Sequence, residues 1–257
     1  MQNQLEQKVN TIINLDYTED DKIWLKSSKT LRKLIGISGM LLPIILIAIT
    51  FLFFDLARPI ESISHYYYTR AGSVFTVILS MIAIFLIVYS GKKSIDFYIS
   101  TIAGICALFV VFFPTGNLSS ICCDTLKAYS VTYIEGNASA GFREDFHLVS
   151  AGLFLLLLAY MSFFLFTKSN KSPELQGRKK RLRNKIYKGC AILIVASLIV
   201  IGLGFLKVIP AHVYNANQLT FWMETLAVES FGFAWLIKGE GLFKDDTEYL
   251  VANESPD

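Results

Sequence analysis

A polar and aromatic stretch between two long apolar runs holds the first residues that could do chemistry: Glu61-Ser-Ile-Ser-His65-Tyr-Tyr-Tyr-Thr-Arg70. Its carboxylate, hydroxyl and imidazole groups can move protons, coordinate a metal ion or hydrogen-bond a polar ligand. If the stretch is helical, Glu61 and His65 share a face because they are four positions apart. Consecutive tyrosines point about 100° apart on a helix, so we expect at least one to face inward. The candidate ligand-binding residues in this stretch are Glu61, Ser62, His65, Tyr67 and Arg70.

The three histidines of the chain, His65, His147 and His212, belong to three separate segments. Zinc sites use imidazole ligands that converge from different elements, so one interpretation is a zinc site formed by all three. A lone histidine at a helix end is more often an ordinary hydrogen-bonded residue, and no H-x-x-x-H or H-E-x-x-H motif is present. Both interpretations stay open, and no cofactor other than this possible zinc is indicated.

Carboxylates near the histidines and in the last apolar run strengthen the case for a site. Asp145 lies two positions before His147, and the last run contains Glu224 and Glu229. A carboxylate at membrane depth is costly unless it is paired, protonated or facing a wet cavity, which makes Glu229 the strongest single candidate. Glu224 and Glu229 point about 140° apart on a helix, so we expect Glu224 at the mouth of a cavity and Glu229 at its floor.

The composition shows which elements must position these residues. The chain has 257 residues, of which 53% are hydrophobic and 18% charged, and this is too apolar for a soluble domain. Crossing a hydrocarbon core takes about 20 apolar residues. We therefore predict an all-α membrane protein, a bundle of six transmembrane helices, at about 34–54, 74–89, 97–113, 148–166, 186–209 and 219–237.

The distribution of lysine and arginine predicts the orientation of the bundle, because cytoplasmic flanks are enriched in them. Basic residues gather before the first run, at Lys92 and Lys93, and in the linker 168–188. Both termini are therefore expected in the cytoplasm, as segments 1–33 and 238–257, flanking a membrane domain 34–237. The linker is interpreted as a topology-setting loop at the anionic inner leaflet, with a lipid-specific pocket as the alternative. Because the first thirty or so residues are polar and mixed in charge, we expect no cleavable signal peptide and expect the first span to act as the insertion signal.

The segment 114–146 is predicted to be the one sizeable loop outside the cytoplasm. It contains the adjacent Cys122 and Cys123, which would face an oxidising compartment. Adjacent cysteines rarely bond to each other, so free thiols and an intermolecular disulfide stay open. The excess of basic residues sets topology and does not indicate nucleic-acid binding.

Several short segments together resemble a family of uncharacterised bacterial membrane proteins with six spans. They are Ser62 to Thr69, Ile102 to Leu108, Phe113 to Thr115, Phe146 with His147, and Trp235 to Glu240. The resemblance covers most of the chain and implies a multi-pass protein of the bacterial inner membrane, with no activity attached. A looser similarity links His65, His147, His212, Ser62 and Asp145 to the CREST membrane hydrolases, which implies a zinc site. That superfamily has seven spans and an H-x-x-x-H pair on its last helix, and this chain has neither.

Three functional hypotheses follow. The favoured one is a non-catalytic protein whose outward-facing polar cavity binds a lipid headgroup, a small polar solute or an ion. The first alternative is a zinc-dependent hydrolase of lipid amides or esters, in which Asp145 or Glu224 handles protons and Ser62 stabilises the transition state. The second is a transporter or channel that uses Glu229. Membrane lipids are the expected partners in all three.

Overall fold

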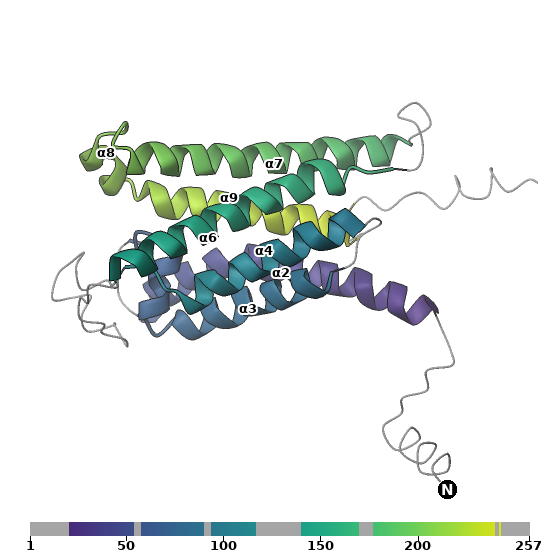
Figure 1. Cartoon of the computed structure of the whole chain (residues 1–257), viewed down its shortest axis with the longest axis horizontal. Coiled ribbons are helices and arrows are strands. Elements are labelled where there is room, and N and C mark those ends of the chain that lie inside the picture. Colours follow the sequence, from purple (N-terminus) through teal and green to yellow (C-terminus); the bar gives the residue numbers. More distant parts are fainter. Residues whose placement is uncertain are drawn as a thin grey trace, which may run out of the picture.

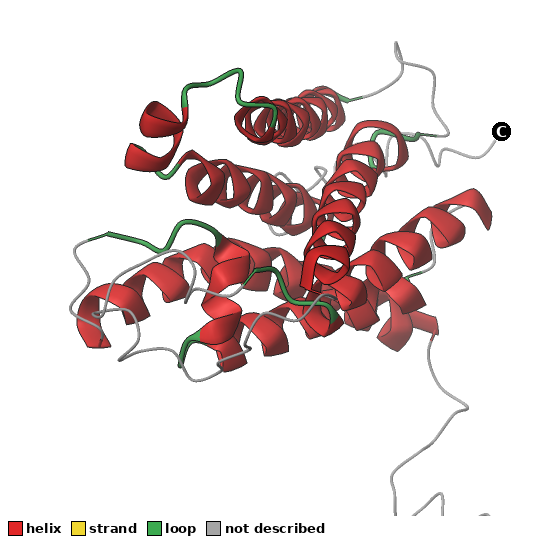
Figure 2. Cartoon of the chain, turned by 60° about the vertical axis from the view of Figure 1, so that its left-hand side comes forward, coloured by secondary structure: helices red, strands yellow, loops and turns green. Residues whose placement is uncertain are grey.

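The computed structural model describes residues 21–53, 58–89, 94–116, 140–169, 177–239 and 242, and it describes side chains from residue 29 onward except those of Phe53 and Ala140. The predicted extracytoplasmic loop lies largely outside these residues, as do Cys122 and Cys123. Within the described ranges all regular elements are helices and no β-strand occurs, as Figure 2 shows. The predicted all-α fold is therefore confirmed.

Each predicted apolar run lies on a helix. The main helices are α2 (Asp21–Phe53), α3 (Gly72–Val88), α4 (Ser94–Phe112), α6 (Ala140–Tyr160), α7 (Arg178–Phe205) and α9 (Leu219–Lys238). A 3₁₀ helix, η1 (Ile63–Tyr68), follows α2, a π-helical turn, η3 (Met161–Leu165), continues α6, and a short α8 (Ala211–Ala216) precedes α9.

Four helices are long and apolar enough to cross a membrane, which indicates a helical membrane protein. The apolar stretches are Lys29–Leu52, Ser94–Phe112, Gly141–Leu165 and Arg178–Phe205, and α3 is an apolar but shorter helix of 17 residues. Large apolar side chains are exposed on the outside of these helices; examples are Ile44 at 53%, Ile84 at 58%, Leu156 at 49% and Ile199 at 56%. A soluble surface rarely exposes so much contiguous apolar area.

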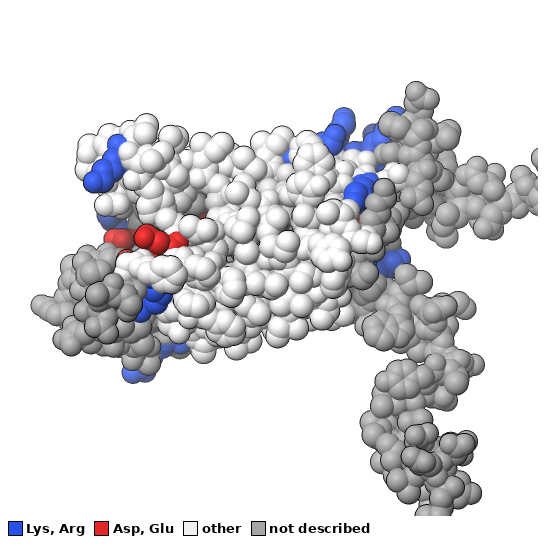
Figure 3. All heavy atoms as spheres, viewed as in Figure 1, with Lys and Arg blue, Asp and Glu red and all other residues white. Residues whose placement is uncertain are grey.

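Charged side chains lie mainly at the two ends of the bundle, and the face seen in Figure 3 carries almost none between them. One end contains α8 and is called the α8 end below. At the opposite end α2 begins and α9 finishes, so it is called the terminal end (Figure 1). The described chain therefore starts and finishes at the same end of the bundle.

The six main helices form a closed ring. Each one packs against its neighbour in the sequence, in the order α2, α3, α4, α6, α7 and α9, and α9 packs against α2. Glycines allow the α2–α9 contact to be close: a Cβ atom at Gly232 would lie 2.6 Å from the carbonyl oxygen of Gly36 and 2.6 Å from the Met40 side chain. Small residues at such crossings let helix backbones approach in a membrane.

The helix limits differ from the predicted spans at several polar ends. α2 begins at Asp21 and α7 at Arg178, before the apolar runs start, because helical hydrogen bonding continues into polar flanks. The fifth helix stops at Phe205, earlier than the predicted 209, where Lys207 adopts a φ of 57° and a turn leads to Pro210. The linker 168–188 is therefore helical from Arg178, and 114–146 from Ala140.

Candidate functional site

The centre of the candidate site is a contact between η1 and α9 at the α8 end. The Ser62 hydroxyl donates to the Glu224 carboxylate, with distances of 2.8 Å to Oε2 and 3.0 Å to Oε1. The backbone N–H of Ile63 donates to the same Oε2 at 2.6 Å. Ser62 is buried and also caps η1, because its Oγ accepts from the Ser64 N–H at 3.1 Å. Two of the predicted site residues are thus brought together.

Two tyrosines anchor η1 in place. Tyr66 is fully buried, its hydroxyl lies 2.8 Å from Oγ1 of Thr50 on α2, and the Ile60 N–H donates to it at 3.3 Å. Tyr68 is also fully buried and donates from its hydroxyl to the Thr115 carbonyl at 2.6 Å, after the end of α4. The expectation that at least one tyrosine faces inward is confirmed, and η1 is fixed by contacts to α2, α9 and the α4 end.

His65 lies on η1 with an unused ring nitrogen. Its Nδ1 atom is buried and has no hydrogen-bond partner in the part of the chain that the structure describes. Burial, with a smaller contribution from nearby His147, lowers the pKa of His65 to about 4, so the ring is neutral at pH 7. A neutral imidazole with a free nitrogen can still donate to or accept from a ligand.

His147 is buried near the start of α6 and has a structural partner. Its Nδ1 lies 2.8 Å from the carbonyl oxygen of Phe113, and because a carbonyl only accepts, Nδ1 carries the proton. The bond ties α6 to the end of α4. The His147 ring is therefore buried and held by the end of α4.

The turn containing α8 adds strained backbone to the same end. Gln218, directly before α9, adopts a φ of 50°, which residues other than glycine rarely do, and its side-chain amide donates to the Pro59 carbonyl. The Tyr214 hydroxyl lies 2.9 Å from Oγ1 of Thr220, one turn before Glu224. The Tyr214 ring lies so close to Gly204 that a Cβ there would be 2.1 Å from it. The start of α9 is thus held from both sides.

The remaining predicted residues lie elsewhere. Glu61 and Arg70 are exposed on either side of η1, and Tyr67 is half-buried, with its ring centroid 5.2 Å from that of Tyr68. Glu229 is half-buried, on a different face of α9 from Glu224, and has no hydrogen-bond or ion-pair partner among the described residues. Asp145 is exposed on α6, and His212 is exposed on α8.

These positions do not fit a zinc site. No group of three or more His, Cys, Asp or Glu side chains is arranged to hold a metal ion within the residues that the structure describes. His65 and His147 are neighbours, but His212 is exposed on α8. Structural and catalytic zinc sites need at least three convergent protein ligands, and the three histidines do not supply them.

An aromatic cluster closes the ring toward the terminal end. The Trp235 side chain is 1% exposed, and its ring centroid lies 5.2 Å from Phe85, 5.1 Å from Tyr89, 5.1 Å from Phe166 and 6.0 Å from Phe231. These rings come from α3 and the residue that follows it, from α9, and from the turn after η3. We call them the Trp235 cluster.

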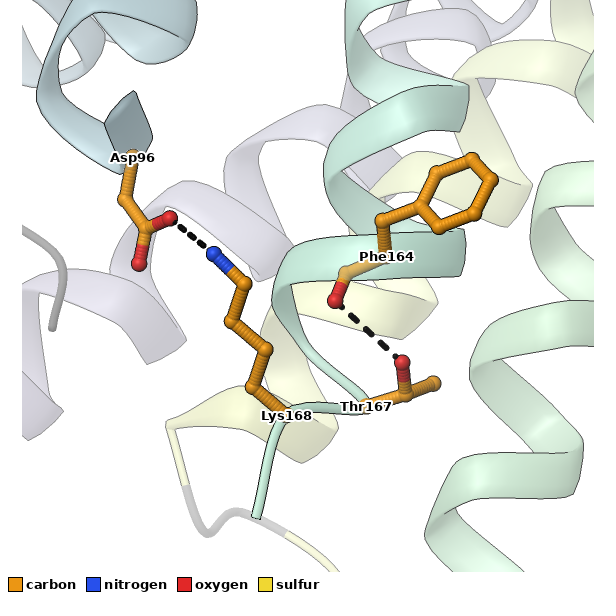
Figure 4. Close-up of polar contacts among 4 residues, drawn as sticks. All are labelled: Asp96, Phe164, Thr167 and Lys168. Carbon is orange, nitrogen blue, oxygen red and sulfur yellow. Dashed lines mark hydrogen bonds and ion pairs between the residues drawn. The ribbon is translucent and has the colours of Figure 1, made fainter. Parts of the chain in front are cut away.

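Next to the Trp235 cluster is an ion pair that sequence reasoning missed. Asp96, at the start of α4 and 3% exposed, pairs with Lys168, which follows η3 (Figure 4). The Arg32 guanidinium of α2 lies 5.5 Å from the centre of the Tyr89 ring. The signal available in the sequence was Asp96 itself, a single acid just after Lys92 and Lys93.

Comparison with known proteins adds no functional assignment. Neither protein-family models, nor curated proteins, nor solved structures give a match to this chain.

Proposed function

We propose that this chain is a six-span protein of a bacterial inner membrane, with both termini in the cytoplasm and the α8 end facing outward. Two features support this orientation. The described chain begins and finishes at one end of the ring. That end contains Lys29, Lys33 and the basic start of α7. Cytoplasmic flanks are enriched in such residues, and an even number of spans returns the chain to the same side.

We further propose that the α8 end binds a small ligand that is positively charged or rich in hydrogen-bond donors. The observation that carries this proposal is Glu224. Its carboxylate is held by Ser62 and Ile63, and no lysine or arginine pairs with it among the described residues. A carboxylate in a membrane domain is costly without a positive partner. A cationic ligand supplies that partner.

His65 is the second group that we assign to this site. Its buried, unpartnered Nδ1 belongs to the same short η1 helix that presents Ser62 and the Ile63 N–H to Glu224. A buried polar atom without a partner is costly in the free protein, so a ligand that hydrogen-bonds to it gains affinity. Ethanolamine-type and choline-type cations, free or as lipid headgroups, combine a positive charge with a polar oxygen, which are the two features that Glu224 and His65 would recognise.

Binding is favoured over conduction or catalysis. The rings of the Trp235 cluster pack edge to face on the cytoplasmic side of Glu224, and this packing argues against a continuous pathway through the ring. The donor arrangement around His65 and His147 gives no support to zinc chemistry.

The experiment compares ligand-induced stabilisation of two glutamate variants of the full chain. Purified protein in a mild detergent is titrated with ethanolamine and with choline while thermal unfolding is followed. A ligand at 100 times its Kd stabilises a protein by about 2.7 kcal/mol, which for this size raises Tm by about 5 to 10 °C. Glu224→Gln keeps the hydrogen-bonding shape but removes the charge, so this shift should be lost.

Glu229→Gln is the matched control, because it makes the same chemical change on the same helix but on another face. It should keep the full ligand-induced shift. If Glu224→Gln keeps the shift as well, or if only Glu229→Gln loses it, the site is not the one proposed. If no cation stabilises the wild type, Glu224 serves only to fix η1.

A further inference from the structure

A stripe of exposed cations runs along one face of α7, from its first residue. The stripe consists of Arg178, Arg181, Lys185 and Lys188, whose spacing of three, four and three positions places them on a single helix face. All four side chains are exposed. Ten positions of an α-helix span about 15 Å, so the stripe covers the first three turns. We call it the basic stripe.

The same face continues as lipid-exposed apolar surface. After Lys188 the spacing of four, three and four leads to Ile192, Val195 and Ile199, which are 60%, 38% and 56% exposed. One helix face is therefore cationic for three turns and apolar for the next three. Headgroups followed by acyl chains present this sequence of chemistries at a membrane surface.

Basic residues on the other faces of α7 already have protein partners. Lys180 donates to the Phe166 carbonyl at 3.4 Å, and Arg183 is buried and has a partner of its own. Within the described residues, by contrast, the side chains of Arg178, Arg181 and Lys185 form no hydrogen bond or ion pair. Lys188 only lies over the Phe163 ring, at 5.5 Å.

The position of the basic stripe is electrostatically unfavourable without an anion. The N-terminus of a helix carries a partial positive charge, and cations three or four positions apart on one face repel one another. The first eleven residues of α7 contain seven lysines and arginines and no acid. An external anion relieves both effects.

From this arrangement we infer that the basic stripe is a binding surface for anionic phospholipids of the inner leaflet. Their phosphates contact Arg178, Arg181, Lys185 and Lys188, and their acyl chains lie along Ile192, Val195 and Ile199. A free phosphate would use the cations but not the apolar continuation, so the geometry favours a lipid. The inference concerns the opposite end of the ring from Glu224 and does not depend on the ligand proposed there.

The test is lipid retention by the purified full chain in a mild detergent, read by native mass spectrometry. The probes are dioleoyl phosphatidylglycerol and dioleoyl phosphatidylcholine, which have the same acyl chains, and inorganic phosphate. The wild type should retain phosphatidylglycerol in preference to phosphatidylcholine. This preference should weaken at 1 M salt, where the Debye length is about 3 Å. Each stripe cation replaced by glutamine should lower the apparent affinity about fivefold.

The control variant removes two exposed cations from the α8 end, Arg70→Gln with Lys207→Gln, and should retain phosphatidylglycerol as the wild type does. Equal retention of both lipids by the wild type, or unchanged preference in the fourfold stripe variant, would overturn the inference. Displacement of the lipid by inorganic phosphate at equal concentration would also overturn it. If the fourfold variant fails to insert, the single changes R181Q and K185Q must still each weaken binding.

Discussion

The closed ring depends on the close contact between α2 and α9, and the change Gly232→Ala tests this directly. The added Cβ would lie 2.6 Å from the Gly36 carbonyl oxygen, 2.6 Å from Met40 Cγ and 2.8 Å from the Met40 backbone nitrogen. Optimal contacts between heavy atoms are about 3.5 to 4 Å, so the two helices must separate by about 1 Å. Two of these three atoms belong to backbone, which cannot move aside as a side chain can.

The expected loss of stability has two opposing parts. Replacing glycine by alanine in a helix is favourable by about 1 kcal/mol from intrinsic propensity. Overpacking costs about 1 to 3 kcal/mol, and a gap of about 1 Å forfeits up to half of the dispersion attraction along the contact. The packing loss extends along α2 and α9, so we expect Gly232→Ala to destabilise the protein by about 2 kcal/mol.

Thermal unfolding of the full chain in a mild detergent measures this loss. For a protein of this size 1 kcal/mol corresponds to about 2 to 4 °C in Tm, so Tm should fall by about 4 to 8 °C. Gly189→Ala on α7 is the matched control, because a Cβ at Gly189 would meet no atom within 4 Å. It should leave Tm unchanged or raise it.

The opposite signs of the two changes are the decisive result. If Gly232→Ala raised Tm as Gly189→Ala does, the backbones of α2 and α9 would not be in contact at this crossing. The closed order of helices would then be wrong.

Two further predictions concern charged groups. Burial lowers the pKa of His65 from 6.5 to about 4, so the folded protein keeps the ring neutral. The contribution of this neutral ring to the free energy of unfolding should be fully present above pH 6.5 and should fall by about 3 kcal/mol as the pH falls to 4. H65Q should flatten this part of a pH series of unfolding, and an unchanged slope would contradict the burial of the ring. Asp96→Asn should cost about 2 kcal/mol by leaving Lys168 unpaired, and adding Lys168→Met should restore part of the loss in the same unfolding assay.

Hydropathy was sufficient to predict the helices, because each apolar run is long and exposes apolar side chains. A chain segment in lipid must satisfy its own backbone hydrogen bonds, and a helix does so. Hydropathy could not predict where α7 ends. The helix ends because the turn into α8 requires a positive φ at Lys207, and a backbone dihedral angle does not change the hydropathy of the sequence. The helical extension of α2 to Asp21 was also missed, because polar flanks satisfy helical hydrogen bonds equally well.

The site was only partly predictable for a related reason. Ser62 and Glu224 were both selected by residue type, but their contact joins positions 162 apart and depends on α9 closing the ring. Depth in the membrane alone favours Glu229 over Glu224, but in the structure it is Glu224 that has hydrogen-bond partners. Asp96 and Lys168 were overlooked because each reads as one more charge in a polar flank, and only packing brings them together.

The closure of the ring by its first and last helices has a consequence for biosynthesis. During translation α2 leaves the ribosome first, yet the helix that covers its Gly36 face is the last to be made. In the six-span arrangement proposed above, that glycine face would stay open to lipid until α9 is made, and Ser62 would lack its acceptor on α9. A nascent chain interrupted before Leu219 would therefore be an open arc, a form that membrane proteases can distinguish from the finished protein.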